Sequence, residues 1–180
     1  HHHDERHSFP TRRSSDLDII LVTEQGKALR FNEQEVRPMG RAAGGVTAIQ
    51  LEKGDHLAGM EVVEKNGELL TISQRGYGKR TPLAEYPVKG RATKGVATVD
   101  KKTIDRVGAI AAARVVQEVD DLTIISSNGL ALRIAVKEIS RSGRATRGVL
   151  VIKLGEDDSV ASLARISAAD LRQAGVNQIN

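Results

Sequence analysis

Gly40-Arg41-Ala42-Ala43-Gly44-Gly45-Val46 is the first of three similar copies of one motif in this chain. The motif returns at residues 90–96 and 143–149, so its copies are 50 and 53 residues apart. A second landmark keeps the same offsets, because the glycines of three expected turns are Gly26, Gly76 and Gly129. Two landmarks that move together indicate a repeated structural unit of about 50 residues, which is the size of a propeller blade.

Each repeat contains short runs rich in valine, isoleucine and leucine that are bounded by glycine, asparagine and aspartate, a pattern typical of antiparallel strands and hairpins. The expected strands lie at residues 19–22, 27–31, 46–51, 57–63, 69–73, 96–99, 109–116, 122–126, 130–134, 149–154 and 160–166. Asn128-Gly129 is expected to form a two-residue hairpin turn in which both residues have positive φ. Helical periodicity is weak before a short expected helix at 168–174. The sequence therefore predicts an all-β fold of propeller-like blades, each with four short strands.

The repeats divide the chain into blades at 18–67, 68–120 and 121–167, followed by a C-terminal tail at 168–180. Residues 1–17 hold four of the five histidines and show no apolar periodicity, so we expect a non-native or disordered leader there. Propellers have at least about four blades. Because three blades are too few to close a ring, we expect the chain to be the last part of a longer array.

Composition excludes several classes of protein. The chain has no cysteine, so it has neither disulfides nor thiolate metal sites. No apolar run is long enough for a membrane span, and no membrane partner is expected. Two tyrosines and two phenylalanines are too few to serve as stacking platforms for single-stranded nucleic acid. The repeats also lack paired carboxylates, a metal cluster or an activated nucleophile, so we expect no catalytic residue and no cofactor in this chain.

Basic residues gather between the first hairpin turn and the repeated motif of each repeat. Residues 75–94 include six basic residues and one acid, and residues 133–147 include five and one. Such charges also occur on solvated loops, but their return at blade spacing favours a ligand with regularly spaced phosphates. The expected DNA-binding residues are Lys27, Arg30, Arg37, Arg41, Arg75, Lys79, Arg80, Lys89, Arg91, Lys94, Arg133, Lys137, Arg141, Arg144 and Arg147.

Several motifs occur together in the second repeat: residues 76–81 (GYGKRT), 85–87 (EYP) and 91–96 (RATKGV). With Gly26-Lys27 before them and residues 136–140 (VKEIS) after them, they resemble the C-terminal domain of the DNA gyrase A subunit. The resemblance extends from residue 18 to about residue 167. It implies a six-bladed β-pinwheel, in which hairpins are exchanged between blades, and this chain would form the last three blades.

The resemblance also implies a function. Double-stranded DNA would wrap around the basic rim of the disc, in support of ATP-dependent negative supercoiling by the parent type II topoisomerase. Catalysis, ATP and magnesium would belong to the rest of that complex, which would contain two A and two B subunits in the bacterial cytoplasm. The partners would be DNA, the B subunit and the remainder of the A subunit.

Two departures from the family pattern limit this expectation. The glutamine-arginine-glycine-rich box expected before the first blade is absent, so the fragment alone should bind and bend DNA rather than hold a full wrap. The acidic tail of many family members is absent too, since residues 167–180 contain one acid, Asp170. Two alternatives stay open: the A subunit of topoisomerase IV and a protein-binding β-propeller scaffold.

Overall fold

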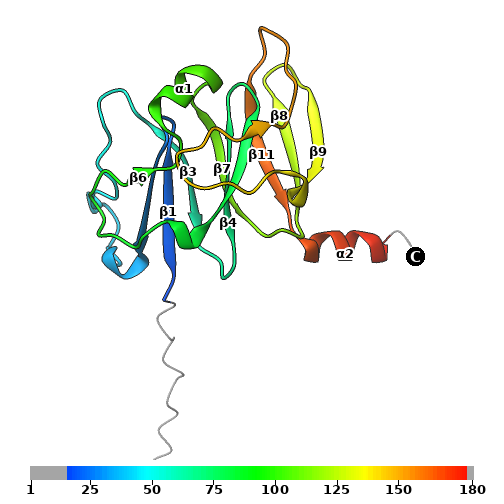
Figure 1. The fold of residues 1–180 in the computed structure, drawn as a ribbon. Coiled ribbons are helices and arrows are strands. Elements are labelled where there is room, and N and C mark those ends of the chain that lie inside the picture. The colour runs from blue at the N-terminus through cyan, green and yellow to red at the C-terminus, as the bar shows by residue number, and fades with distance from the viewer. Residues whose placement is uncertain (1–15, 178–180) are drawn as a thin grey trace, which may run out of the picture.

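The computed structural model describes residues 16–177, which form three antiparallel sheets side by side (Figure 1). The first sheet has the order β3 (Leu57–Val62), β1 (Asp18–Thr23), β2 (Lys27–Asn32) and β6 (Val96–Ala97). The second has the order β10 (Val149–Leu150), β5 (Tyr77–Pro82), β4 (Glu68–Ser73) and β7 (Ile110–Val116). The third has the order β11 (Val160–Ile166), β8 (Asp121–Ser126) and β9 (Ala131–Ala135). The predicted all-β fold of propeller-like blades is confirmed.

Strands are exchanged between neighbouring blades. The third strand of the second repeat, β6, pairs with β2 of the first repeat, so that Val96 lies opposite Ala28. In the same way β10 of the third repeat pairs with β5 of the second, and Val149 lies opposite Gly78. The first two sheets therefore each take one strand from the following repeat. The blade ranges 18–67, 68–120 and 121–167 stay a prediction of where the sequence repeats begin and end. They do not coincide with the sheets, because two of the three sheets include a strand of the following repeat.

The expected third strands need correction. Residues 46–51 form no strand and make only an isolated bridge between Ile49 and Thr93, because the described part of the chain has no earlier repeat with which they could pair. The strands expected at 96–99 and 149–154 are two residues long in β6 and β10. They end early because the chain turns around a carbonyl of the neighbouring hairpin: the N–H groups of Thr98 and Val99 both donate to the Gly26 oxygen, at 2.8 and 3.2 Å.

The hairpin turn at Asn128-Gly129 is also longer than expected. Only Gly129 has a positive φ, at 88°. Its N–H donates to the Ser126 carbonyl at 3.1 Å, and the Ser126 N–H donates to the Leu130 carbonyl at 2.8 Å. The loop therefore has three residues, a turn followed by a glycine in the left-handed region, rather than the two residues that the dipeptide suggested.

Helices are few. The sequence interpretation missed α1 (Lys101–Val107), which begins where the Asp100 side chain accepts a hydrogen bond from the Thr103 N–H at 3.0 Å. The terminal helix α2 (Ala168–Asn177) is longer than the expected 168–174. Single turns of 3-10 helix at Glu33–Glu35, Leu83–Glu85 and Val136–Glu138 follow the second strand of each repeat. None of the helices within residues 16–177 is long and apolar enough to cross a membrane.

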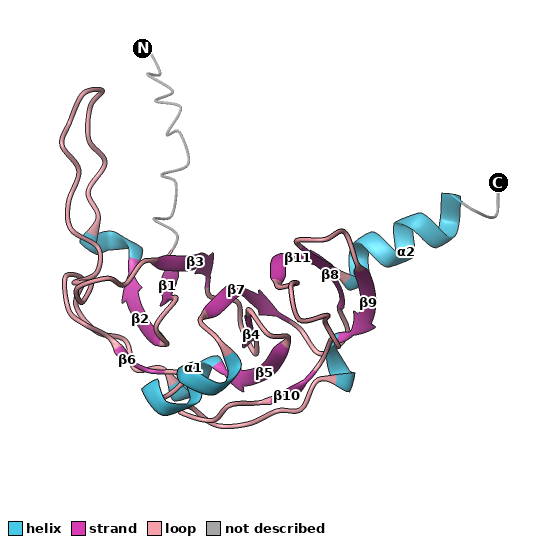
Figure 2. Cartoon of the chain, turned by 90° about the horizontal axis from the view of Figure 1, so that it is seen from above, coloured by secondary structure: helices cyan, strands magenta, loops and turns pink. Residues whose placement is uncertain are grey.

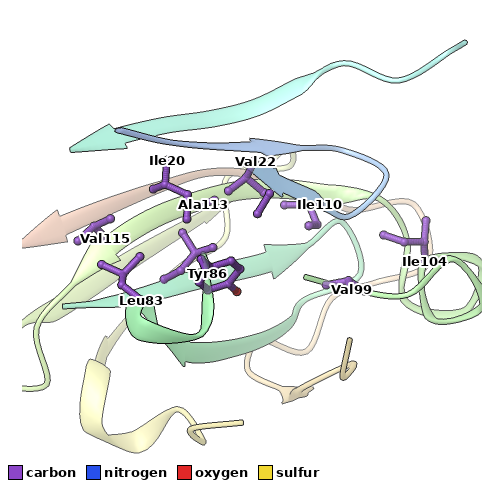
Figure 3. Packing of buried hydrophobic residues seen from close by; sticks show 11 residues of the cluster. Ile20, Val22, Leu83, Tyr86, Val99, Ile104, Ile110, Ala113 and Val115 are labelled. Carbon is purple, nitrogen blue, oxygen red and sulfur yellow. The ribbon is translucent and has the colours of Figure 1, made fainter. Parts of the chain in front are cut away.

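Two apolar cores fill the spaces between blades. The first is shown in Figure 3, where Tyr86 and Leu83 of the second repeat lie against Ile20 and Val22 of β1. The second core includes Ile139, which lies 53 residues after Tyr86 and is equally buried. The residue after the second 3-10 turn, Tyr86, and the residue after the third, Ile139, each pack into the core between their own blade and the preceding one.

The blades fan out around one side. Seen from above, β3, β7 and β11 lie on the inner side of the fan, and β6, β5 and β10 lie on the outer side (Figure 2). The three inner strands line an open hollow of about 450 Å³. The exchanged strands and the loops that lead to them therefore form the outer rim.

Candidate nucleic-acid interface

Three of the expected DNA-binding arginines each form an ion pair with an acid twelve residues earlier. The pairs are Arg30–Asp18 (2.8 Å), Arg80–Glu68 (2.8 Å) and Arg133–Asp121 (3.0 Å). Each pair joins the end of a second strand to the start of the first strand within one hairpin. The spacing of twelve was visible in the sequence, where these acids follow the repeat period, but charge alone did not reveal the pairing.

Two of these arginines also join neighbouring blades. The Arg30 Nη1 donates to the Leu83 carbonyl at 3.0 Å, and the Arg80 Nε donates to the Ile139 carbonyl at 2.6 Å. Arg80 is buried with its partner Glu68. In this structure a DNA phosphate could not reach Arg80, so its predicted role in DNA binding is corrected to a structural one.

Lys79 is buried as well, although the sequence interpretation placed it on the DNA surface. Its Nζ donates to the Gly143 carbonyl at 3.0 Å, to the Thr146 hydroxyl at 3.2 Å and to the Thr98 carbonyl. Gly143 and Thr146 belong to the third repeat and Thr98 belongs to the second. The ammonium group therefore holds residues 143–146 against the second repeat. The equivalent positions in the other repeats hold leucine, at Leu29 and Leu132.

The burial of Lys79 predicts an unusual pH dependence of stability. Burial lowers the pKa of Lys79 to about 8, against the opposing effect of the Glu85 carboxylate, and the Arg144 guanidinium lowers it further. The unfolded chain therefore binds more protons than the folded chain between pH 8 and about 10.5, and stability linked to this lysine rises with pH in that window.

We expect wild type to gain up to about 3 kcal/mol of unfolding free energy relative to Lys79→Met as pH rises from 8 to 10.5. Equilibrium denaturation in urea at several pH values would measure this difference for both proteins. Methionine keeps the length of the side chain without its charge, so other titrating groups cancel in the comparison. If the unfolding free energy of wild type, relative to that of Lys79→Met, stays constant or falls as pH rises, burial of a charged lysine is contradicted.

The arginine of the repeated motif has a structural contact too. The Arg91 Nη1 donates to the Thr47 carbonyl at 2.9 Å, and the Arg144 Nη1 donates to the Ala97 carbonyl at 3.4 Å. Both acceptors lie at the third-strand position of the preceding repeat, since Ala97 is in β6 and Thr47 is the equivalent residue of the first repeat. Since both arginines are half-buried, they hold successive motif loops together and offer only part of their surface to a ligand.

The final glycine of the motif is required by close packing. Gly95 and Gly148 have φ values of 74° and 79°. A Cβ on Gly95 would lie 2.4 Å from the Ala28 oxygen, and one on Gly148 would lie 2.3 Å from the Gly78 oxygen. Only glycine can bring the exchanged strand this close to its partner, which explains why the sequence repeats it.

A further group of the predicted basic residues is free on the surface. Six of the predicted residues are exposed, and their side chains make no hydrogen bond or ion pair with other residues in the described range. They are Arg37, Arg41, Lys89, Lys94, Lys137 and Arg147. They lie two to a repeat within the motif loops, which we define as residues 33–45, 83–95 and 136–148. The structure thus brings the motif loops together on the outer rim and separates free cations from those that hold the fold.

Three further residues are intermediate cases. The Lys27 side chain is half-buried and has no described partner. Arg75 is exposed, and its guanidinium donates to the Arg106 carbonyl at 2.9 Å. Arg141 is exposed, but its Nε is 2.8 Å from a Glu68 carboxylate oxygen. That contact raises the pKa of Arg141 above its ordinary value. Across residues 16–177 no group of three or more His, Cys, Asp or Glu could hold a metal ion.

The sequence and fold match known proteins. A family model described as DNA gyrase C-terminal domain, beta-propeller, matches residues 17–64, 67–117 and 120–167. The DNA gyrase A subunit of Escherichia coli (strain K12) is 41% identical over 154 residues, which cover 86% of this chain and 17% of that protein. The chain therefore spans less than a fifth of that relative's length.

Two solved structures share the arrangement of blades. The DNA gyrase A C-terminal domain superposes with a TM-score of 0.77 at 30% identity, covering 84% of this chain and 51% of that chain. The C-terminal domain of DNA topoisomerase IV superposes with a TM-score of 0.79 at 26% identity, covering 91% of this chain and 52% of that chain. With three family matches at the repeat period and the exchanged strands seen in the sheets, the chain belongs to the DNA gyrase C-terminal domain family of β-propellers.

Proposed function

We propose that this chain binds double-stranded DNA through its motif loops. The observation that carries the proposal is the regular placement of free cations, since each motif loop presents two exposed basic side chains with no described protein partner. A duplex that follows the outer rim would meet the same pair in successive blades. Basic side chains that donate no hydrogen bond to the protein can neutralise phosphates and release counterions.

Binding of this kind is independent of base sequence. Contacts from lysine and arginine to phosphates position a protein on the duplex and carry no sequence information. The names of the relatives, the DNA gyrase A subunit and DNA topoisomerase IV, support a duplex ligand. The buried Lys79 and Arg80 are left out of the proposed contact set, and Arg91 and Arg144 contribute mainly by holding the loops in place.

We further propose that the chain acts as part of a DNA gyrase A subunit rather than of topoisomerase IV. The 41% identity to a gyrase A subunit supports this choice. There it would bend and wrap DNA for ATP-dependent negative supercoiling in the bacterial cytoplasm, in an assembly of two A and two B subunits. The active site, ATP and magnesium would be supplied by the rest of that assembly, and this chain would contribute no catalytic residue and no cofactor.

Removing free cations from the motif loops should weaken DNA binding. With about six phosphates neutralised, log K for a short duplex should fall with log salt at a slope of roughly −5. Changing Lys94 and Arg147 together to alanine should reduce that slope by about 2 and the affinity by about tenfold near 0.1 M salt. Fluorescence anisotropy with a labelled duplex at several salt concentrations would measure both quantities.

The matched control is Lys53→Ala with Lys65→Ala. Both lysines are exposed and lie outside the motif loops, so this double variant loses the same net charge. A diffuse attraction to a positive protein predicts equal losses for the two double variants, whereas rim binding predicts a much smaller loss for the control. Equal losses of DNA affinity in the two double variants, with both folded, would rule out binding at the outer rim.

A further inference from the structure

One helix interrupts the repeat pattern at the end of the sheets opposite the 3-10 turns (Figure 1). In the first and third repeats, residues 51–56 and 154–159 make a short turn between the third-strand position and the strand that follows. In the second repeat the corresponding segment contains α1. Figure 2 shows α1 on the outer side of the fan, between β6 and β5. The helix therefore adjoins the outer rim.

The helix also replaces a carboxylate at the tip of a hairpin. In the first and third repeats an aspartate, Asp55 or Asp158, accepts a hydrogen bond at 3.0 Å from the backbone N–H of the residue at the hairpin tip. In the second repeat the tip residue is Arg75, and its N–H donates to the Val107 carbonyl at 3.2 Å. Because a neutral carbonyl at the end of α1 takes the place of an aspartate, this hairpin tip lacks the negative charge that the other two have.

Three exposed cations gather on α1 and beside it. Lys102 and Arg106 are four residues apart, so their side chains are neighbours on the helix surface. The Arg75 guanidinium donates to the Arg106 carbonyl at 2.9 Å, which places a third cation at the end of the same helix. Within residues 16–177 the side chains of Lys102 and Arg106 make no hydrogen bond or ion pair. We call Arg75, Lys102 and Arg106 the α1 cluster.

The acids of this segment do not cancel the charge of the α1 cluster. With Lys101 the cluster gives four cations against two acids, Asp100 and Asp105, and hence a net charge of +2. The Asp100 carboxylate is engaged at the start of the helix, where it accepts from the Thr103 N–H. Ile104 of α1 is buried in the first core, which anchors the helix and leaves its cations on the surface (Figure 3). This end of the second blade is therefore basic.

The same end of the third blade has the opposite charge. Its turn contains Glu156, Asp157 and Asp158, against one neighbouring cation, Lys153, so three acids and one cation give a net charge of −2. A free cation of the third repeat, Lys137, lies instead in the 3-10 turn at the other end of the sheet. A duplex on the outer rim would therefore be attracted toward α1 at the second blade and repelled from this end of the third.

We propose that double-stranded DNA crosses the outer rim obliquely, so that its phosphates contact the α1 cluster at the second blade and avoid residues 153–158 at the third. The inference rests on the proposed function, in which DNA follows the motif loops. It adds cations that lie outside those loops to the contact set, in the middle of the path. Because contacts to phosphates position a duplex, the cluster would set the angle at which the DNA leaves the rim.

Removing the helix cations tests the contact. Lys102→Ala with Arg106→Ala should lower the affinity for a short duplex about tenfold near 0.1 M salt and reduce the salt slope by about 2. Both side chains are exposed and alanine favours helix, so α1 should stay folded, which circular dichroism would check. The matched control is again Lys53→Ala with Lys65→Ala, which loses the same net charge and should change the affinity much less.

The outcome separates the oblique path from rim binding itself. If the Lys94→Ala, Arg147→Ala variant loses affinity but the α1 variant matches the control, the oblique path is wrong and rim binding stands. If neither variant loses more affinity than the control, the proposed function fails as well.

Tethered cleavage tests where the duplex lies. The chain has no cysteine, so an iron–EDTA group can be attached at one introduced cysteine. Asp105→Cys places it on α1 and Asp157→Cys places it at the corresponding end of the third blade, and each change removes one acid. We expect several-fold more cleavage of a bound duplex from residue 105 than from residue 157. Equal cleavage from the two positions, or more from residue 157, would overturn the oblique path.

A third tether reports on the rim. Thr93→Cys places the reagent in the motif loop of the second repeat, where any duplex on the outer rim should be cleaved. Cleavage from residues 93 and 105 together supports a duplex that spans the rim and α1. Cleavage from residue 105 without cleavage from residue 93 would place the DNA elsewhere and overturn both proposals.

Discussion

Glu68→Ala is expected to destabilise the protein by about 3–5 kcal/mol, because it leaves a buried arginine without its counter-charge. The Glu68 side chain is 5% exposed and accepts from the Arg80 Nη1 and the Arg141 Nε, each at 2.8 Å. Arg80 cannot move to solvent without giving up its bond to the Ile139 carbonyl, which holds the third blade. Urea denaturation followed by circular dichroism would measure the loss.

Asp121→Ala is the matched control for this change. It removes the equivalent ion pair from the third blade, where Arg133 is largely exposed and can be solvated when its partner is lost. An exposed pair contributes about 1 kcal/mol or less, so the control should cost far less than Glu68→Ala. Similar losses of stability for the two variants would mean that burial does not determine how much the ion pair contributes to the free energy of unfolding.

Gly148→Ala is expected to cost about 3 kcal/mol or more, because an added Cβ would lie 2.3 Å from the Gly78 oxygen and force β10 away from β5. Gly45→Ala is the control at the equivalent position. It has a similar φ and no described atom within 4 Å of its Cβ, so it should carry only the backbone strain of about 1 kcal/mol.

Both glycine variants should be unfolded in urea at the same protein concentration. The expected result is a large loss for Gly148→Ala and a small one for Gly45→Ala. A loss at Gly45 as large as that at Gly148 would show that backbone conformation, rather than close approach of the exchanged strand, explains the repeated glycine.

Much of the fold was readable in the sequence because its signals are local. Glycines at fixed offsets and short apolar runs predicted the blades, the hairpins and the all-β class. The exchange of strands was implied only by the family resemblance. No local pattern shows that Val96 pairs with Ala28 rather than within its own repeat, and this is also why the strand expected at 46–51 was wrong.

The candidate interface was only partly predictable. Charge and repetition placed the basic residues in the correct loops, but they could not show which cations the protein uses internally. Lys79 and Arg80 lie in the middle of β5, where residues 78–81 are all buried, and their side chains bond to carbonyls of the third repeat. The leucines at the positions equivalent to Lys79 were the one available sign that this lysine points inward.

Strand exchange has a consequence for the chain while it is being synthesised. β2 ends at Asn32, but its partner β6 begins only at Val96. At about 5–20 residues per second, roughly 3–13 s of translation separate the two, and the edge of the first sheet stays open for that time. Open edges invite mispairing with other nascent chains, and charged side chains on the edge discourage it. The charges of Lys27 and Arg30 on β2 would therefore reduce aggregation of the growing polypeptide before the neighbouring blade has been synthesised.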